Sequence, residues 1–320
     1  MNSLRDVDER SPRAIGEDAR EQLLAGLSVR ERRMDLAGIP TVVLEGGDGP
    51  PIILLHGPGE FALTWLRVLP ALVATHRVVV PDLPGHGASL MADEPLDADR
   101  VLAWLDELID RTCPSLPALA GHLVGGAIGA RLAISRPGRL SRLILVDTFG
   151  LRFLRPRPMF ALTLIGFMVR PSDGSRDRFF RQCFVDMDRL REELGERWEP
   201  LMKLGLQGAA SPHQKAALRS LMPQFGLHAI PATDLSRISI PTALVWGRQD
   251  RQTPLHVAER ASARFGWPLH VIQDAADDPA FEQPVAFLRA LRTEFGASSD
   301  SVKLESRNEG QFGTASTVRR

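Results

Sequence analysis

The sequence contains no tyrosine and only two cysteines among its 320 residues. Two cysteines, Cys113 and Cys183, are too few for a disulfide framework, and we expect both to be buried thiols. The first ten residues carry charges and lack the apolar core of a secretory signal. These absences predict a cytoplasmic protein that is not held together by disulfides.

Net charge is also missing, because Lys plus Arg equal Asp plus Glu at 39 each. A neutral chain has no overall field that would attract nucleic acid or an anionic membrane. The longest apolar run, Met159 to Val169, is about half the length that a membrane span requires. We therefore expect a small apolar or neutral molecule as the partner, with no nucleic acid and no membrane span.

Short β-branched runs alternate with longer helical patterns, which predicts a parallel sheet with helices on both faces. The expected strands are Arg33–Ala37, Ile39–Leu44, Pro51–Leu55, Arg77–Val80, Leu116–Ala120, Leu140–Val146, Thr242–Trp246 and Leu269–Ile272. The expected helices outside the central interruption are Ile15–Leu27, Phe61–Val73, Ala98–Arg111, Val124–Ile134, Pro254–Phe265 and Pro279–Phe295.

The interruption, residues 149–240, contains no convincing strand and three or four helical patterns. A helical insertion between two parallel strands lies at their carboxyl ends, where such sheets bind ligands, so we interpret it as a cap. The core is then formed by residues 31–148 and 241–296. Residues 1–30 are predicted to be a peripheral N-terminal extension, and residues 297–320 a disordered tail.

The most informative stretch runs from Pro117 to Leu132 and reads PALAGHLVGGAIGARL. It resembles the strand, sharp turn and helix that present the nucleophile of α/β-hydrolases, in the pattern GxSxG. Gly121 and Gly125 keep the two small positions that let strand and helix approach closely. Leu123 stands where the serine belongs, and a leucine side chain has no lone pair with which to attack a carbonyl.

Four other segments match the same family in order: HGPGEFALTW from His56, PDLPGHGAS from Pro81, VWGRQD from Val245 and DDPAFEQP from Asp277. The chain is therefore similar to the capped α/β-hydrolases, such as meta-cleavage-product hydrolases, epoxide hydrolases and haloalkane dehalogenases. The resemblance implies a mostly parallel eight-stranded sheet flanked by helices, with an all-helical cap inserted after the sixth strand. Function must still be argued from the site.

The resemblance also assigns the catalytic positions. The triad acid matches Asp250. The histidine normally precedes xPxxExP, and counting back from Glu282 and Pro284 puts Asp277 in its place. The oxyanion loop matches Gly57, Pro58 and Gly59, with Val124 after the elbow. Proline has no N–H to donate, so one oxyanion donor is lost unless Gly59 supplies it.

Losing either the nucleophile or the histidine of a serine hydrolase removes about 10⁶ in turnover, or roughly 8 kcal/mol. We therefore interpret the chain as a degenerate member of the family, either a small-molecule binding pseudoenzyme or a non-hydrolytic catalyst. Asp147 and Glu60 are alternative acids that could act without covalent catalysis. An active ester or C–C hydrolase with non-standard residues is the first alternative, and no cofactor or metal is expected.

A second alternative is a dinucleotide-binding protein, because Gly57, Gly59 and Ala62 fit GxGxxA after a strand and Asp82 follows about 20 residues later. His56, His86 and His122 lie inside family motifs and are expected to hold loops. The two histidines of the predicted cap, His213 and His228, are expected at its surface.

Overall fold

The computed structural model describes residues 12–91 and 96–296, so the predicted tail at 297–320 lies outside the described residues. Eight strands form one sheet, in the spatial order β1-β2-β4-β3-β5-β6-β7-β8. They are β1 Arg30–Leu36, β2 Ile39–Gly46, β3 Pro51–Leu55, β4 Arg77–Pro81, β5 Ala118–His122, β6 Arg142–Val146, β7 Thr242–Gly247 and β8 Leu269–Ile272. The β1–β2 and β2–β4 pairs are antiparallel, and all other pairs are parallel.

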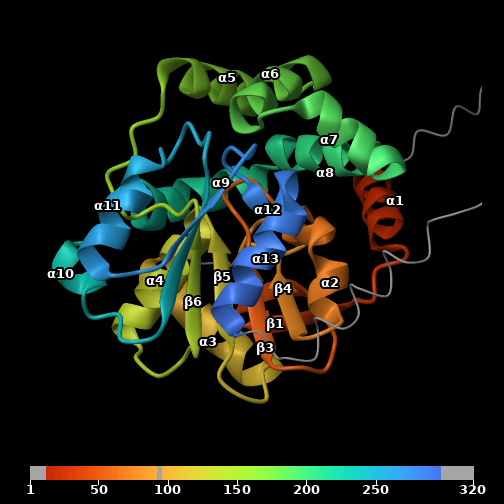
Figure 1. Ribbon diagram of the computed structural model, residues 1–320. Helices are drawn as coiled ribbons and strands as arrows, with labels where there is room; N and C mark the ends of the chain where they lie inside the picture. The colour runs from red at the N-terminus through yellow and green to blue at the C-terminus, as the bar shows by residue number, and fades with distance from the viewer. Residues whose placement is uncertain (1–11, 92–95, 297–320) are drawn as a thin grey trace, which may run out of the picture.

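Helices cover both faces of this sheet (Figure 1). The helices outside the segment between β6 and β7 are α1 Pro12–Leu24, η1 Ala62–Arg67, α2 Leu69–Val73, α3 Ala98–Thr112, α4 Val124–Ser135, α11 His256–Phe265, α12 Pro279–Glu282 and α13 Pro284–Phe295. Successive side chains of a strand point to opposite faces. Accordingly Ile53 and Leu55 of β3 join the apolar cluster under α3 and α4, whereas Ile52 and Leu54 join the one under α2 and α13. The expected sheet architecture is confirmed.

The segment between β6 and β7 is helical, as predicted, and it lies at the end of the sheet farthest from α3 (Figure 1). Six α-helices form it, which is more than the three or four expected. They are α5 Pro158–Val169, α6 Asp173–Cys183, α7 Met187–Leu194, α8 Trp198–Ala210, α9 Pro212–Leu221 and α10 Ala232–Leu235, with short turns η2 Gly195–Arg197 and η3 Met222–Gly226. The side chains of Ser172, Asp186 and Ser211 cap the starts of α6, α7 and α9.

Several boundaries differ from the prediction. Pro284 removes a backbone donor and divides the last helix into α12 and α13. The pattern from Phe61 to Val73 forms the tight turn η1 before α2 rather than one helix. The N-terminal helix is also less peripheral than expected: α1 packs against α8, Leu23 is fully buried, and Arg20 pairs with Asp82 at 3.1 Å.

Candidate functional site

The turn between β5 and α4 has the sharp geometry that the sequence predicts. Leu123 adopts φ 46° and ψ −107°, a conformation that costs a non-glycine residue about 1–3 kcal/mol. A Cβ on Gly125 would lie 2.5 Å from the carbonyl oxygen of Leu55, so only glycine fits where α4 crosses β3. The strained elbow is therefore present, with an aliphatic side chain at its tip.

The side chain of Leu123 is 3% exposed and belongs to the same apolar cluster as Phe149 and Phe225. Its carbonyl oxygen accepts hydrogen bonds from the N–H of Phe149 and the hydroxyl of Thr148. The elbow is thus tied by its backbone to the segment that follows β6. At its tip the side chain offers only hydrophobic contact.

The oxyanion loop is occupied by a carboxylate of the chain itself. The N–H of Gly57 donates to Oε2 of Glu60 at 2.7 Å. Pro58 has no N–H, and Gly59 has a positive φ of 81°. On the other side of the elbow, Val124 is the first residue of α4. A backbone donor of this loop is thus paired with a negative charge of the chain itself.

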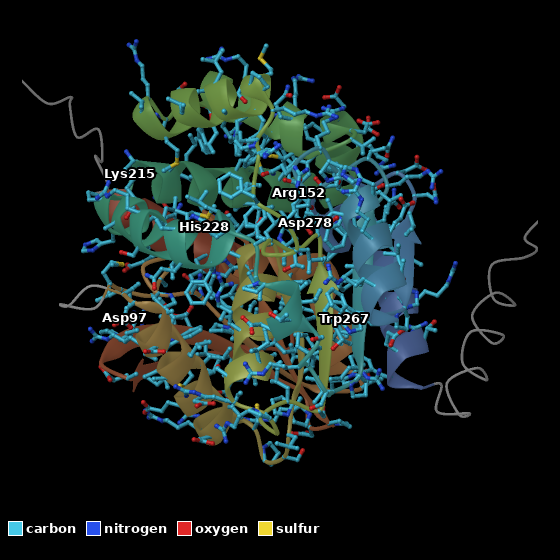
Figure 2. All side chains as sticks on the ribbon, turned by 90° about the vertical axis from the view of Figure 1, so that its left-hand side faces the viewer. Asp97, Arg152, Lys215, His228, Trp267 and Asp278 are labelled. Atoms are coloured by element: carbon cyan, nitrogen blue, oxygen red, sulfur yellow. The ribbon has the colours of Figure 1, made fainter. Side chains whose placement is uncertain are left out.

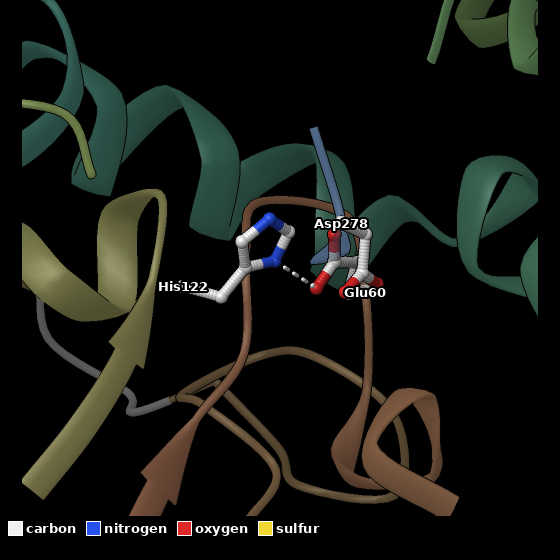
Figure 3. A group of neighbouring side chains, drawn as sticks. All are labelled: Glu60, His122 and Asp278. Carbon is white, nitrogen blue, oxygen red and sulfur yellow. Dashed lines mark hydrogen bonds and ion pairs between the residues drawn. The ribbon is translucent and has the colours of Figure 1, made fainter. Parts of the chain in front are cut away.

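Glu60 also meets His122, the residue before the elbow tip (Figure 3). The Nδ1 of His122 donates to Oε2 of Glu60 at 3.1 Å, and its Nε2 donates to the backbone oxygen of Asp277 at 2.5 Å. Both ring nitrogens face acceptors, so the imidazole is charged. Burial alone would lower the pKa of His122, but the carboxylates of Glu60 and Asp278 outweigh it and raise that pKa to about 10.

The same three residues are the only group of possible metal ligands within the described residues. One ligand atom from each of Glu60, His122 and Asp278 lies within 4.8 Å of the others. A metal needs the lone pair of a neutral imidazole. In this arrangement Nδ1 donates a proton to Glu60 and Nε2 donates one to a carbonyl, so the set acts as a buried ion-pair network.

The predicted triad acid and the predicted histidine position come close together. Oδ1 of Asp250 accepts from the backbone N–H groups of Gln252 and Thr253 at 2.6 and 3.0 Å, and Oδ2 pairs with the Thr253 hydroxyl. The amide Nε2 of Gln252 donates to Oδ2 of Asp277. No histidine pairs with Asp250 in the described chain, and Gln252 connects the two aspartates instead.

Asp147 completes this group from the end of β6. It has a φ of 41° and is fully buried, and its Oδ1 accepts from the N–H of Gly247 at 3.0 Å. Asp147 shares a side-chain hydrogen bond with Asp250, whereas Asp277 Oδ1 has no donor among the described groups. Asp147, Asp250 and Asp277 therefore lie in one buried group, in which Asp277 is only 6% exposed.

Burial dominates the acidity of these carboxyls. It raises the pKa of Asp147 well above its usual range, with the neighbouring Asp250 adding to the effect. Burial and then Asp250 likewise raise the pKa of Asp277. Burial also raises the pKa of Asp250, against hydrogen bonds from Thr253 and Gln252. A neutral carboxyl can share its proton with a neighbouring carboxylate and can donate a hydrogen bond, whereas a carboxylate only accepts hydrogen bonds.

Sequence reasoning missed three members of this region. Gln252 follows the acid motif without belonging to it. Asp278 is 8% exposed, lies at the level between the sheet and the helices above it (Figure 2), and has a pKa raised to about 6 by burial. Glu282 accepts from the N–H groups of Val185 and Ala276, and burial raises its pKa to about 7. Runs such as DRQTP and DDPAFE contain these residues but do not show where they point.

The remaining candidates are structural. Nε2 of His56 accepts from the N–H of Leu83, which makes Nδ1 the donor to Gly57 and fixes a neutral tautomer. Burial lowers the pKa of His86 to about 4. His213 and His228 are exposed, as expected.

The two cysteines differ from each other. Cys113 is half-buried rather than buried, which corrects our expectation. Cys183 is buried beside Asp277, whose N–H donates to its carbonyl oxygen. Burial, and then the neighbouring Asp277, raise the pKa of the Cys183 thiol well above its usual range. A thiol kept protonated in this way is a poor nucleophile.

The residues that match the dinucleotide-binding pattern form hydrogen bonds with other groups of the protein itself. Asp82, the expected ribose ligand, accepts from the N–H groups of Ala62 and Ala88 at 2.6 and 2.9 Å and pairs with Arg20. Gly57 donates to Glu60 instead of offering its N–H to a phosphate. Two surface hollows of about 300 and 290 Å³ lie beside β1 and β2, and neither is lined by the elbow or by the acids described above.

Comparison with known proteins gives a consistent picture. Residues 52–290 match the model of the alpha/beta hydrolase family. The chain is 29% identical over 260 residues to the dihydrolipoyllysine-residue acetyltransferase component of the acetoin cleaving system of Pseudomonas putida, with 77% of this chain and 65% of that protein covered. The chain thus spans less than two thirds of that relative's length.

Two further matches span most of the partner protein. The magnesium-chelatase 30 kDa subunit of Rhodobacter capsulatus is 32% identical over 232 residues, covering 68% of this chain and 76% of that protein. The structure of 2-hydroxy-6-oxo-6-phenylhexa-2,4-dienoate hydrolase from Rhodococcus sp. strain RHA1 superimposes with a TM-score of 0.72 at 22% identity, covering 84% of this chain and 99% of that one.

Proposed function

The chain belongs to the alpha/beta hydrolase family, and from that premise we propose that it is a member without covalent hydrolytic chemistry, which binds a small apolar or neutral molecule. Residues 149–240 act in this proposal as the cap over a core of residues 31–148 and 241–296. The observation that carries the proposal is Leu123 at the tip of a strained elbow, buried to 3% exposure.

The surroundings of the elbow support the same conclusion. Asp250 pairs with Thr253 and Gln252 instead of orienting a histidine, and Asp277 stands at the histidine position. Nucleophile, base and one oxyanion donor are replaced together. Residual catalysis from binding alone would be roughly 10³–10⁴ over water, and even that requires an intact oxyanion site.

The test is to treat the purified full chain with a fluorophosphonate probe and with short p-nitrophenyl esters. We expect no labelled serine and no turnover above that of heat-treated protein. A serine labelled in proportion to loss of ester turnover would refute the proposal, because it would reveal a reactive centre elsewhere. The ligand itself is sought by mass spectrometry of small molecules released from the native protein.

Introducing Ser at position 123 and His at 277 tests the assignment of these two positions. The Leu123→Ser/Asp277→His variant should gain measurable ester hydrolysis, and adding Gln252→Ala should increase it, since the amide of Gln252 occupies the space between positions 250 and 277. The Leu119→Ser/Asp277→His variant is the matched control, because Leu119 is buried on β5 away from the turn. Absence of any gain would leave the assignment of these two positions unsupported.

The acid group favours a second candidate, an acid–base catalyst that forms no covalent intermediate. Asp147 lies buried against Asp250, Asp277 Oδ1 has no donor among the described groups, and both Asp147 and Asp277 have raised pKa values. A carboxyl held neutral near pH 7 can donate a proton to a bound molecule. If the recovered ligand is returned chemically altered by the native protein but unaltered by Asp147→Asn, the catalyst replaces the simple binder.

A further inference from the structure

Helix α5, in the outer layer of the helical segment, has an apolar face that the other residues described by the structure leave uncovered. Met159, Leu162, Ile165 and Val169 are 56%, 65%, 60% and 77% exposed. At 3.6 residues per turn these four fall on one side of the helix. Phe160 and Phe167, on the other side, are buried.

The inner side of α5 is fully used, so the outer stripe is not the ordinary packing face of a cap helix. Phe160 and Phe167 contact Phe179 of α6 with ring centroids 5.2 and 5.7 Å apart. Phe153, which precedes α5, adds another exposed apolar side chain at 52%. Helices α5 and α6 together form the outer layer of the helical segment (Figure 1).

Charge around this stripe is strongly one-sided, although the whole chain is neutral. From residue 148 to residue 172 there are four arginines and no acidic residue. Arg155, Arg157 and Arg170, at the two ends of α5, are exposed, and none forms an ion pair with a carboxylate of the described residues. On α6 both acids, Asp173 and Asp177, pair with Arg176.

We propose that this face, α5 with its flanking arginines, docks on the surface of an anionic lipid bilayer. The apolar stripe would enter the interface between headgroups and acyl chains, while the arginines reach lipid phosphates. No helix in the described part of the chain could cross a membrane, so the contact is peripheral. Our expectation that a neutral chain ignores anionic membranes was drawn from total charge, which hides this local excess.

Charge complementarity selects the lipid over a second copy of the chain. A two-fold dimer would place the same patch against itself and bring Arg155, Arg157 and Arg170 of both copies together. Each of these unpaired positive charges instead gains from a negative surface, by roughly a factor of five in affinity per arginine. The proposal does not depend on whether the site beneath is a binder or a catalyst.

The test is flotation of the full chain with vesicles of phosphatidylcholine alone or with 30% phosphatidylglycerol, at low and high salt. We expect binding to the anionic vesicles that falls with salt. Leu162→Glu/Ile165→Glu should abolish it, and Arg155→Gln/Arg157→Gln should weaken it by about 25-fold at low salt. Val285→Glu and Arg260→Gln, exposed residues on α13 and α11, are matched controls and should bind as the native chain does.

Three results would overturn the proposal. The first is failure of the native chain to float with anionic vesicles. The second is a loss of binding in the two control variants as large as in the α5 variants. A dimer in sedimentation that Leu162→Glu/Ile165→Glu dissolves, without vesicle binding, would assign the face to self-association instead. All substituted residues are exposed, and circular dichroism confirms that each variant is folded before comparison.

Discussion

At position 123 of the elbow, a glycine variant should not be less stable than an alanine variant. This differs from regular backbone, where glycine is the less stable of the two. Leu123 is nearly fully buried, so Leu123→Ala should cost about 2–5 kcal/mol of unfolding free energy. In regular backbone, glycine costs about 0.5–1 kcal/mol more than alanine. At φ 46° a Cβ itself is unfavourable by about 1–2 kcal/mol, which glycine removes. Leu123→Gly should therefore be as stable as Leu123→Ala or up to about 1.5 kcal/mol more stable.

The assay is urea unfolding followed by the fluorescence of the five tryptophans. Leu119 on β5 supplies the matched pair, since it is fully buried in regular strand. There Leu119→Gly should be about 0.5–1 kcal/mol less stable than Leu119→Ala. If glycine is worse than alanine by the same margin at both positions, residue 123 does not occupy the strained turn, and the identification of the elbow is wrong.

Three other predictions concern the acids, the ion-pair network and the glycines. The raised pKa of Asp147 means that the folded state keeps a proton that the unfolded chain releases, so its contribution to stability falls as pH rises above the unfolded value of about 4. Asp147→Asn should thus raise the melting temperature at pH 8 more than at pH 4, and equal shifts at both would contradict this. Glu60→Gln should lower the pKa of His122 from about 10 in NMR titration. The raised pKa of His122 stabilises the fold fully below about pH 6.5, and this contribution is lost as the pH rises through about 10. The Glu60→Gln variant should therefore be destabilised at pH 6 but little at pH 11. An unchanged imidazole titration would show that Glu60 is not the partner of His122. Gly125→Ala should destabilise the protein, because the new Cβ would meet the backbone of Leu55. Gly166→Ala, on the exposed side of α5, meets nothing within 4 Å and should stabilise the protein by about 1 kcal/mol. A change in unfolding free energy of the same sign at both positions would contradict the close crossing of α4 and β3.

Local sequence determined the frame of this protein. Runs such as Pro51–Leu55 and Thr242–Trp246 are strands because a fully buried parallel strand needs continuous apolar residues. The elbow is recognisable at Gly121–Gly125 because the close approach of strand and helix requires a small residue two positions before and two positions after the tip of the turn. That Leu123 itself cannot act as a nucleophile follows from the sequence alone, since no fold can give that side chain a lone pair.

Only the tertiary structure decided what the remaining polar groups do. His122 and Leu123 are neighbours in sequence, yet the imidazole pairs with Glu60 and the backbone of Asp277, while the leucine joins an apolar cluster. Gln252 connects Asp250 to Asp277 because loops 25 residues apart in sequence meet at the same edge of the sheet. The pKa values of those acids depend on burial and on neighbours that no local pattern specifies.

The apolar run Met159–Val169 shows the same division. This run forms helix α5, one of the helices of the segment between β6 and β7. Only one side of α5 packs against α6. The other side faces outward, and arginines lie at both ends of the helix. Residue order sets which side chains share a face of a helix, but the number of faces that neighbouring elements cover is settled only when the whole chain has packed.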